Sequence, residues 1–484
     1  MNKQAYIGGL DIGTTGCKIV LFDTQGHEAF TSYREYEVKR DRGLHEVDIP
    51  AVWQAVKEVL ADCAPYEIAA VGVTSFGESF VILDDQDTPI APTMLYTDPR
   101  GREACAALSH QFDADTLARR TGTVLHEMYS LPKLMYLKEQ DPTIFERAAC
   151  ILLMEDFVVY MLTGVRQIDY SLAARTAAFD IREKAWITEL FDFAGIDPSL
   201  MSTPVPTGTV AGRIKADVAT ELGLSPKTTV VTGCQDQIAA LVGANVLEVG
   251  EAMDGIGTVE CVPIIVKEPP TDASVYAAGY SFVPHVGGNY ACYVLSYAGG
   301  ATLKWFRDKI SHTDYAEMDK TIPAEPTDLL ILPHFAGAAT PYMDSSARAA
   351  ILGLTFEHTQ SDIYKALMEG TSYEIYLNLC EMEKHGLSLS SVTATGGGAN
   401  SEVWLQIKAD IFGIPVKSLS GTQIGAAGTA LLAGRAIGVW NEDTRLIGDR
   451  KVYTPDVGRH AIYRKQYEKY RRIYGTVKEV FGDV

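Results

Sequence analysis

Short apolar runs alternate with longer amphipathic stretches along this chain, a pattern typical of α/β proteins. The first run, residues 7–10, leads through a tight turn rich in glycine and threonine at 11–16 to a second apolar run at 19–22. Residues 23–26 are a turn signal that predicts a third strand directly after it. The chain is therefore predicted to begin with a β-hairpin that is extended by a third strand.

The same pattern predicts the later elements and a domain boundary. Strands are expected at 69–74 and 80–83, helices at 132–139, 155–163 and 237–246, and a connecting loop rich in Pro, Ser and Thr at 198–206. Tyrosines at 463, 467, 470 and 474 keep helical spacing, so 459–472 is predicted to be a C-terminal helix with a solvated basic side. A new strand-and-turn pattern begins after 249–250. We therefore place the boundary near 247–250, between domains 1–248 and 249–484.

Length and composition support two globular domains. A chain of 484 residues is too long for one ordinary core, and its 47% hydrophobic and 21% charged residues are typical of a soluble protein. No uncharged apolar run approaches the ~18 residues of a membrane span, so no membrane partner is expected. The residues before the first strand do not resemble a secretory signal, and the eight cysteines are scattered without a Cys-x-x-Cys pair. These features predict reduced thiols in a cytoplasmic protein.

The net charge of −20 limits the partners of the chain. Binding to nucleic acid requires a basic face, so a nucleic-acid partner is not expected. The same charge makes the long-range field unfavourable to a phosphorylated ligand. Local groups must then attract such a ligand.

The first turn carries groups of this kind. The backbone amides of 13–16 and the hydroxyls of Thr14 and Thr15 can donate to phosphate oxygens, because glycines let the backbone approach closely. Lys18 adds a positive charge, and Asp11 is placed to hold Mg²⁺ through water. The turn matches neither a Walker loop nor a dinucleotide fingerprint. A hairpin that simply needs glycines is the structural alternative.

Four motifs in this chain resemble those of the FGGY carbohydrate kinases, which belong to the actin-like ATPase superfamily. Residues 11–16 resemble the first phosphate loop of that family, and 232–237 resemble the segment with its catalytic aspartate. Residues 252–258 are similar to its second phosphate loop, and 395–404 to its adenosine-binding motif. The resemblance implies an α/β fold with two ribonuclease-H-like domains flanking a catalytic cleft. A weak echo of the first motif in the third agrees with two related halves.

The resemblance identifies two carboxylates as candidate catalytic groups. Asp236 would be the general base for the acceptor hydroxyl, and it is predicted to lie at the start of a helix, where the helix dipole favours a carboxylate. An ordinary N-cap is the structural alternative for Asp236. Asp11 would position Mg²⁺ or the transferred phosphate, whereas its simpler role is to fix the turn through hydrogen bonds to its own backbone.

The resemblance also implies which residues surround ATP. In the first loop these are Gly13, Thr14, Thr15 and Lys18, of which the last three would meet the β- and γ-phosphates. The remaining candidates are Gly257, Thr258, Gly300, Lys304, Gly397, Gly398 and Ser401, the last three near the adenosine. A flexible loop is the alternative for the glycines at 396–398.

The substrate side matches the family least well. Glycerol kinases typically have Arg-Glu, and xylulokinases Met-His, where this chain has Gly77 and Glu78. A buried Glu78 would accept hydrogen bonds from two neighbouring hydroxyls of a polyol or open-chain sugar. Gly77 leaves space for an acceptor larger than glycerol, and the missing Met-His pattern argues against D-xylulose. Glu260, after the second phosphate loop, also departs from the family pattern and receives no role.

Other substrate-side candidates come from weaker matches. Asp98 and Arg100 are expected to brace the sugar site, with a surface ion pair as the simpler alternative. Gln237 would hold another hydroxyl. Met128 and Tyr129 match the position of a substrate-facing aromatic, although Met128 has a plain core role as its alternative.

Together these features predict an ATP- and Mg²⁺-dependent kinase that phosphorylates a primary hydroxyl of a small sugar or polyol. Two other classes stay open: an actin-like-fold ATPase that acts as a chaperone or polymer, and a sugar-binding protein without catalysis. No β-rich peptide-binding domain follows the ATPase portion, which argues against a chaperone, and a polymer subunit has no need for Glu78 and the residues 98–100. Asp11, Lys18 and Asp236 are all present, so nothing supports a loss of catalysis. The sequence leaves open the acceptor (L-xylulose, other ketoses, gluconate, glycerol or longer polyols) and whether the protein is a homodimer, a state frequent in the family.

Overall fold

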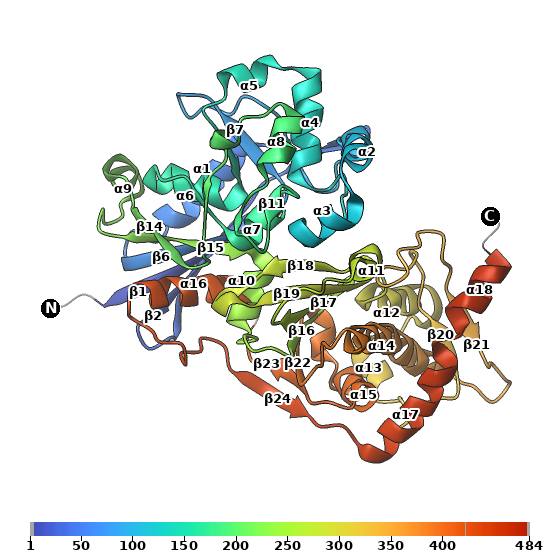
Figure 1. The fold of residues 1–484 in the computed structure, drawn as a ribbon. Helices are drawn as coiled ribbons and strands as arrows, with labels where there is room; N and C mark the ends of the chain where they lie inside the picture. Colours follow the sequence, from blue (N-terminus) through green and yellow to red (C-terminus); the bar gives the residue numbers. More distant parts are fainter. Residues whose placement is uncertain (1–3, 422, 482–484) are drawn as a thin grey trace. The chain divides into compact units, whose positions relative to one another are not determined.

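A computed structural model describes residues 4–421 and 423–481, which form two compact units (Figure 1). Unit 1 comprises the described residues up to Leu247, Val283–Tyr290 and Gln423–Ile447. Unit 2 comprises Glu248–Phe282, residues 291–421 and the described residues from Gly448 onward. The chain first leaves unit 1 at Leu247, where the hydrophobic pattern changes, and two later segments return to it.

The main sheet of unit 1 has the strand order β14-β15-β6-β1-β2-β3. Its strands are β1 (Ala5–Ile12), β2 (Gly16–Asp23), β3 (Glu28–Glu35), β6 (Glu67–Ser75), β14 (Thr209–Arg213) and β15 (Thr229–Gln235). The first three are antiparallel neighbours, as the N-terminal pattern predicts, whereas β6 and β15 run parallel to β1. The carboxyl ends of β1, β6 and β15 therefore meet at one edge of the sheet, the edge at which ligands of such sheets bind.

A second large sheet, carried mainly by unit 2, has the order β18-β19-β17-β16-β22-β23-β24. Its strands are β16 (Glu251–Ile256), β17 (Glu260–Val266), β18 (Ser281–Pro284), β19 (Tyr290–Ser296), β22 (Ser391–Thr395), β23 (Val416–Leu419) and β24 (Asp449–Tyr453). β16 and β17 form an antiparallel hairpin, and β22 and β23 run parallel to β16. The order β17-β16-β22-β23 thus repeats the order β2-β1-β6-β15. The predicted α/β class with two related domains is confirmed.

Short strands complete the β-structure. They pair β4 (Val38–Asp41) with β5 (Leu44–Val47) and β5 with β8 (Thr93–Met94), β7 (Phe80–Leu83) with β9 (Cys150–Leu153), β10 (Gln167–Asp169) with β13 (Thr203–Val205), β11 (Phe179–Asp180) with β12 (Ala185–Trp186), and β20 (Leu330–Leu332) with β21 (Ala350–Leu352). β13 corrects the predicted loop over 198–206. A proline is tolerated there because a strand of a two-stranded sheet always has one free edge.

Unit 1 contains helices that pack on its main sheet and others that lie away from it. They are α1 (Ile49–Ala61), α2 (Arg102–Gln111), α3 (Ala114–Thr121), α4 (Ser130–Gln140), α5 (Thr143–Arg147), α6 (Met154–Thr163), α7 (Tyr170–Ala174), α8 (Thr188–Ala194), α9 (Ala216–Leu222), α10 (Asp236–Gly243) and α16 (Ile424–Ala436). Those on the main sheet include α1, α6, α10 and α16. The side chain of Asp48 caps α1, and α1 buries Val52, Val56 and Val59 in the core of unit 1. α6 ends as predicted at Gly164, whose φ of 79° suits glycine.

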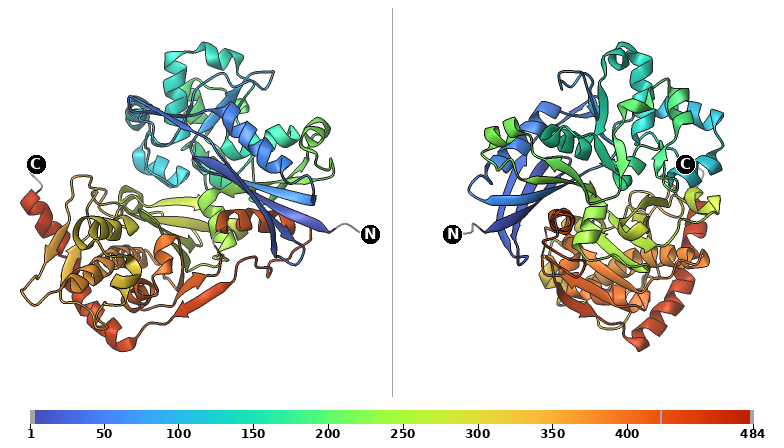
Figure 2. Two further views of the ribbon diagram at one scale, coloured as in Figure 1. Left: turned by 180° about the vertical axis from the view of Figure 1, so that it is seen from behind. Right: turned by 60° about the vertical axis from the view of Figure 1, so that its left-hand side comes forward.

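The helices of unit 2 are α11 (Ala273–Ala277), α12 (Gly300–Phe306), α13 (Tyr315–Asp319), α14 (Gln360–Lys384), α15 (Glu402–Phe412), α17 (Val457–Tyr470) and α18 (Ile473–Phe481). The helix predicted over 459–472 corresponds to α17, which ends at Tyr470, whereas Tyr474 lies on the separate helix α18 near the C-terminal end of the chain (Figure 2). Tyr463 and Tyr470 pack on Tyr373 of α14, whereas α18 buries Ile473 and Val477. The break lets each helix turn its own apolar face inward.

Helix α16 lies close to the sheet of unit 1, and glycines make this approach feasible. A Cβ atom at Gly9 would lie 1.8 Å from the carbonyl oxygen of Ala426. One at Gly72 would lie 2.2 Å from the carbonyl oxygen of Thr429, and one at Gly233 would lie 2.6 Å from its hydroxyl. These glycines lie on β1, β6 and β15, so the helix packs directly on three adjacent strands. This packing brings the start of α16 to the edge where β1 ends.

Two bulk expectations can be compared with the structure. Within residues 4–421 and 423–481, no helix has the length and hydrophobicity to span a bilayer. All eight cysteines fall in these ranges and are free thiols, five of them buried.

Candidate active site

Three carboxylates from separate strands gather in unit 1. Asp11 lies near the end of β1, Glu78 follows β6 and Asp236 follows β15. In the register of the sheet, Asp11 lies opposite Thr74 of β6, and the last residue of β15 lies opposite Ser75. Asp236 is close enough to feel the charges of both Asp11 and Glu78. The predicted base, the phosphate-loop carboxylate and the acceptor-side carboxylate are thus brought together.

Asp236 is the first residue of α10, and the N-cap of that helix is Gln235. The alternative of Asp236 as an ordinary N-cap is therefore wrong. The helix ends at Gly243, earlier than the predicted 246. The carboxylate of Asp236 lies at the positive end of the dipole of α10, as predicted.

The surroundings of Asp236 raise the pKa of its carboxyl group. Burial, and then the negative charges of Asp11 and Glu78, raise the pKa of Asp236 to about 7, although the Gln237 amide and the Arg175 charge act in the opposite direction. A carboxylate that titrates near neutral pH is suited to take a proton from a hydroxyl.

Asp11 is also held in an environment that disfavours its charge. Burial raises the pKa of Asp11 to about 6, and the nearby Lys18 opposes this shift. Lys18 Nζ in turn donates to Gln423 Oε1 at 2.8 Å, and a Cβ at Gly425 would lie 3.1 Å from Asp11 Oδ2. Among the described residues, no backbone amide donates to the Asp11 side chain. The simpler role of fixing the turn is therefore not supported.

The first turn is shaped by its neighbours on β3 and beyond. The Gly13 amide donates to the Gly16 carbonyl at 2.9 Å, and the Tyr36 hydroxyl donates to the Gly13 carbonyl. A Cβ at Gly16 would lie 2.5 Å from the Tyr33 hydroxyl oxygen, so packing alone requires this glycine. Thr15 is exposed, and its carbonyl accepts from the Tyr36 amide at 3.1 Å. The structural alternative thus explains Gly16 but not the threonines.

The carboxylates of the site determine whether it could hold Mg²⁺. Within residues 4–421 and 423–481, no group of three or more His, Cys, Asp or Glu side chains is arranged to hold a metal ion. Mg²⁺ keeps several waters and commonly takes one or two carboxylates plus phosphate oxygens, so a protein cage is not required. The partly buried Asp11 carboxylate, whose pKa is raised by desolvation, would be stabilised by a cation. Asp11 therefore fits the part of a single anchor.

The substrate-side carboxylate is already paired with a residue that the sequence analysis missed. Glu78 is 6% exposed, and its Oε1 accepts from Arg175 Nε at 2.6 Å and forms an ion pair with a terminal nitrogen of Arg175. The backbone of Glu78 is left-handed, with φ of 68°, a conformation that costs a non-glycine residue about 1–2 kcal/mol. Such strain is typical of functional positions. Arg175 follows an alanine-rich apolar run, where an arginine requires a partner, and this was its only sequence signal.

Asp98 and Arg100 form a buried pair rather than the alternative surface one. Asp98 is fully buried, and its carboxylate accepts from Arg100 Nε at 2.8 Å and from the His45 amide at 2.8 Å. Burial opposes ionisation, yet these hydrogen bonds hold the pKa of Asp98 below its usual value. Lys133, whose pKa burial lowers to about 8, feels the charges of Asp98 and Glu78. Lys133 therefore lies near both the Asp98–Arg100 pair and Glu78.

The remaining acceptor-side candidates differ in their surroundings. Tyr129 is buried and bonds Thr123 through its hydroxyl at 2.6 Å, and the Arg175 guanidinium lies 5.0 Å from its ring centroid. Met128 is only partly buried, so its alternative as a core residue is not supported. Gln237 is the second residue of α10 and is partly exposed beside Asp236.

A pocket of about 920 Å³ in unit 2 collects the other predicted residues. Its lining includes every unit 2 candidate of the nucleotide side, namely Gly257, Thr258, Gly300, Lys304, Gly397, Gly398 and Ser401. Trp305, Tyr315, Tyr364 and Asp319 line it as well, and the sequence analysis missed their role. The volume lies within the usual range for small-molecule sites, and the aromatic lining suits a flat ring.

Helix α12 holds the second phosphate loop in place. The amides of Gly300 and Ala301, its first residues, donate to the carbonyls of Gly257 and Thr258 at 2.7 and 3.1 Å. The first amides of a helix have no partner within the helix, so the loop satisfies them. The loop and α12 are thereby fixed to one another.

Ser401 organises the opposite side of this pocket. Its hydroxyl accepts from the Trp404 amide as the N-cap of α15 and donates to Asp319 at 2.8 Å. Tyr364 donates to the other oxygen of Asp319 at 3.0 Å. The preceding Gly397–Asn400 forms a 3₁₀ turn, which gives this segment a regular backbone.

Two neighbouring glycines allow a matched test of this pocket. A Cβ at Gly398 would lie 2.3 Å from Ile256 Cγ2, whereas one at Gly397 would meet nothing within 4 Å. We expect Gly398→Ala to lower the free energy of unfolding by about 1–3 kcal/mol through overpacking and to weaken ATP binding. Gly397→Ala should leave the free energy of unfolding within about 0.5 kcal/mol of wild type. Urea unfolding and nucleotide titration measure both, and equal behaviour of the two variants would contradict the geometry.

A buried ionic cluster explains Glu260. Lys408 of α15 contacts Asp254 at 2.8 Å and also Glu260, and all three side chains are fully buried. Burial and the Asp254 charge raise the pKa of Glu260 well above its usual value. The cluster joins α15 to the β16–β17 hairpin, whose turn carries Gly257 and Thr258. Glu260 is therefore a structural residue behind the second phosphate loop.

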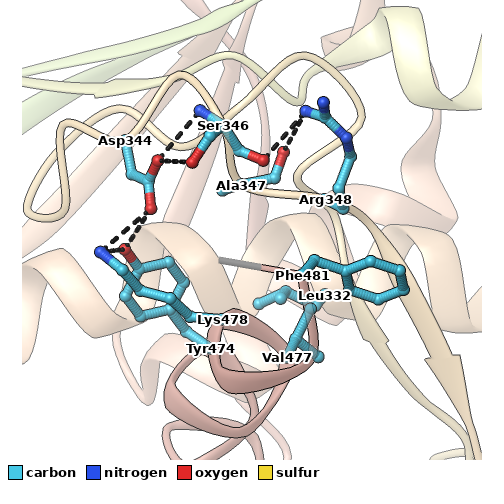
Figure 3. Close-up of a pocket in the computed structure, with 9 residues that line it drawn as sticks. All are labelled: Leu332, Asp344, Ser346, Ala347, Arg348, Tyr474, Val477, Lys478 and Phe481. Carbon is cyan, nitrogen blue, oxygen red and sulfur yellow. Dashed lines mark hydrogen bonds and ion pairs between the residues drawn. The ribbon is translucent and has the colours of Figure 1, made fainter. Parts of the chain in front are cut away.

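A further cleft in unit 2 contains none of the predicted residues (Figure 3). Asp344 at its rim accepts from Ser346 and Tyr474 and lies 3.2 Å from Lys478 Nζ. Its volume of about 10 Å³ is enough for about one water molecule. The contacts of Asp344 with Tyr474 and Lys478 connect α18 to the loop around Asp344. The cleft has no room for a substrate.

Comparisons with known proteins agree with this arrangement. The chain matches the models "FGGY family of carbohydrate kinases, N-terminal domain" over residues 6–243 and "C-terminal domain" over 255–437. It is 27% identical to a xylulose kinase of Bacillus subtilis (strain 168) over 98% of each chain. It is also 27% identical to a gluconokinase of the same organism, over 93% of this chain and 92% of the relative. The solved structure of a ligand-bound xylulose kinase from Lactobacillus acidophilus aligns with a TM-score of 0.88 at 26% identity, covering 99% of each chain.

The two family models together span most of the chain, and their boundary falls where the chain first passes from unit 1 to unit 2. The duplicated strand order and the four motifs are consistent with that match. This chain belongs to the FGGY family of carbohydrate kinases, enzymes that transfer phosphate from ATP to an alcohol group.

Proposed function

We propose that this protein phosphorylates a primary hydroxyl of a small, open-chain sugar or polyol, with Asp236 as the general base. The supporting observation is the position of Asp236, whose pKa is about 7, at the end of β15 and beside Asp11 and Glu78. Phosphoryl transfer needs positioned groups, neutralised charge and an acceptor for the hydroxyl proton. These strand ends supply a carboxylate for the last of these tasks.

The nucleotide is assigned to two sets of residues. In unit 2, the pocket of about 920 Å³ would hold the adenosine, with Gly397, Gly398 and Ser401 on one side and Gly300 and Lys304 on another. In unit 1, the Gly13, Thr14 and Thr15 turn and Lys18 would hold phosphate oxygens, as glycine-rich turns do. Gly257 and Thr258 would contact phosphate from the second loop.

Mg²⁺ is the proposed metal cofactor, and Asp11 is the residue that would hold it, directly or through water. When bound, it would neutralise charge on the phosphates. Lys18 and the turn amides add fixed positive charge and donors at the same strand end. Asp11 is therefore proposed both as a catalytic residue and as a ligand of Mg²⁺.

The acceptor is assigned to Gly77, Glu78, Tyr129, Gln237 and Asp236, all in unit 1, with Met128 at the rim. Asp98 and Arg100 would act as a buried brace through Lys133. The relatives include a xylulose kinase, a gluconokinase and a glycerol kinase, so the acceptors to test are ketoses, aldonates, glycerol and longer polyols. The free thiols fit a reducing compartment such as the cytoplasm.

The pKa of Asp236 predicts the pH dependence of the reaction. Only the ionised carboxylate takes a proton, so kcat/KM should fall about tenfold per pH unit below about pH 7. The Glu78 charge raises this pKa, and Glu78→Gln should therefore move the acidic limb to lower pH. A pH profile of kcat/KM for both proteins measures the shift. A limb that lies at the usual carboxyl pKa in wild type, or that does not move in Glu78→Gln, would contradict the assignment.

The proposal is tested by ADP release from ATP and Mg²⁺ with a panel of acceptors. The panel contains D- and L-xylulose, D-ribulose, D-fructose, D-gluconate, glycerol and xylitol. Strong stimulation by one or more of these compounds supports the kinase. ADP release that no acceptor changes would instead favour an ATPase of the actin-like class.

A further inference from the structure

We propose that Arg175 is a specificity-determining residue that, together with Glu78, recognises two neighbouring uncharged hydroxyls of the acceptor. This inference rests on the proposed kinase function and adds the substrate class. Arg175 lies far from Glu78 in the chain, and no motif of the sequence points to it. The pair selects a neutral vicinal diol over an aldonate.

Arg175 is held in place by the contact of helix α7 with strand β15, which precedes Asp236. Arg175 is the C-cap of the short helix α7, whose N-cap Asp169 accepts from the amides of Ser171 and Leu172. The Ser171 hydroxyl accepts from the Gln235 amide at 3.0 Å. Because Gln235 directly precedes Asp236, α7 is tied to the base-bearing strand end. Arg175 therefore enters the acceptor site from a rigid support.

Gly77 and Arg175 are complementary in shape. A Cβ at Gly77 would lie 3.1 Å from Cγ, 3.4 Å from Cβ and 3.6 Å from Nε of Arg175. The space beside Glu78 that glycine opens is thus filled by the stem of Arg175 rather than left for a larger acceptor. This corrects the expectation for Gly77. The arginine side chain reaches Glu78 from another part of the chain.

The guanidinium is oriented on two sides. Its Nε donates to Glu78 Oε1 at 2.6 Å, and its Cζ lies 5.0 Å from the centroid of the Tyr129 ring. The Arg175 side chain is 12% exposed and that of Glu78 is 7% exposed, so both are largely desolvated. A rotamer-rich side chain fixed in this way loses little further entropy on binding. The pair is preorganised.

The chemistry of the pair matches a diol. A guanidinium offers only donors and an ionised carboxylate only acceptors, and here the two lie side by side. One acceptor hydroxyl can receive a hydrogen bond from Arg175 while its neighbour donates to Glu78. Oε1 of Glu78 makes the contacts with Arg175, and we assign the bond from the second hydroxyl to Oε2.

The same geometry disfavours a carboxylate on the acceptor. The charge of Arg175 is already balanced by Glu78 in direct contact. A substrate carboxylate against this guanidinium would also lie beside the Glu78 carboxylate and near Asp236, which feels both residues. Like charges at such separations repel strongly where water is excluded. Aldonates should therefore be poor acceptors.

The test compares Arg175→Met, Arg175→Lys and wild type on D-xylulose, glycerol, xylitol and D-gluconate. For the best neutral compound, Arg175→Met should raise KM about 10- to 100-fold and change kcat much less, because a charged hydrogen-bond donor is lost. Arg175→Lys should recover part of this loss. The KM for ATP should be unchanged in both. Arg102→Met, which removes an exposed arginine paired with Glu127, is the matched control and should behave as wild type.

A second variant and a binding measurement protect the test against misfolding. Gly77→Ala keeps Arg175 but crowds its stem, and it should raise the same KM in a protein that unfolds like wild type. Calorimetric titration of the best neutral compound should show weaker binding to Arg175→Met by the same factor. An unchanged KM in Arg175→Met, or a wild type that prefers D-gluconate, would overturn the inference while the kinase stands. A wild type inactive on all four compounds and on the wider panel would overturn the proposed function and the inference with it.

Discussion

Asp236→Asn is expected to lower kcat about 10²–10⁴-fold, the usual loss when a general base is removed. Asparagine keeps the shape of the side chain but does not accept a proton from the acceptor hydroxyl. ATP binding should stay within about twofold of wild type, because every unit 2 candidate for the nucleotide is unchanged. Steady-state kinetics with saturating acceptor, together with nucleotide titration, measure both quantities.

The same variant separates a catalytic role from a structural one. Burial and the charges of Asp11 and Glu78 work against an ionised Asp236, so that neutral asparagine should leave the free energy of unfolding unchanged or raise it. Gln237→Ala, at the next position of α10, is the matched control and should mainly raise the KM of the acceptor. Turnover of Asp236→Asn near the wild-type rate would show that the base lies elsewhere. A fall in kcat accompanied by a large fall in the free energy of unfolding would indicate that Asp236 is a structural residue.

Lys408→Met is expected to lower the free energy of unfolding by about 3–5 kcal/mol, as is typical when one partner of a buried ion pair is removed. The side chains of Lys408, Asp254 and Glu260 have no exposed surface, so the carboxyls left behind could be neither solvated nor paired. The cluster supports the hairpin with Gly257 and Thr258. ATP binding should therefore weaken in parallel. Urea unfolding with and without ATP measures the effect.

Two controls make this prediction specific. Burial and the Asp254 charge raise the pKa of Glu260 well above its usual value, so the neutral side chain of Glu260→Gln should cost less stability than Lys408→Met. Lys451→Met breaks the half-exposed pair with Glu402 on the surface of unit 2 and should cost less than about 1 kcal/mol. A Lys408→Met protein as stable as these controls would refute the structural role of the cluster.

Features encoded by neighbouring residues could be predicted from the sequence. The N-terminal hairpin, the end of α6 at Gly164 and the start of α10 near Asp236 follow from turn residues and apolar runs. The nucleotide-side candidates of unit 2 come from three separate segments, yet the structure gathers them around one pocket. Short motifs located them because glycines are needed wherever backbone approaches a ligand or another backbone.

Features that depend on distant partners could not be predicted in this way. Glu78 was expected to offer both oxygens to the acceptor, but Arg175, from a later helix, occupies one of them. Glu260 had no explanation until Lys408 was found beside it. Helix α16 follows the adenosine motif in sequence yet packs on β1, through contacts at Gly9 that no local pattern reveals. Pairing across long sequence separations is set by tertiary packing, which periodicity does not report.

The central claim is that phosphate from ATP ends on a primary hydroxyl of a small acceptor. It is tested most directly by proton-coupled ³¹P NMR of the protein with ATP, Mg²⁺ and the acceptor that best stimulates ADP release. We predict a new phosphate ester signal split into a triplet by the two protons of a CH₂–O–P group, formed in step with ADP. A signal from inorganic phosphate alone would show hydrolysis and contradict the account. A doublet would assign transfer to a secondary hydroxyl and contradict the proposed position.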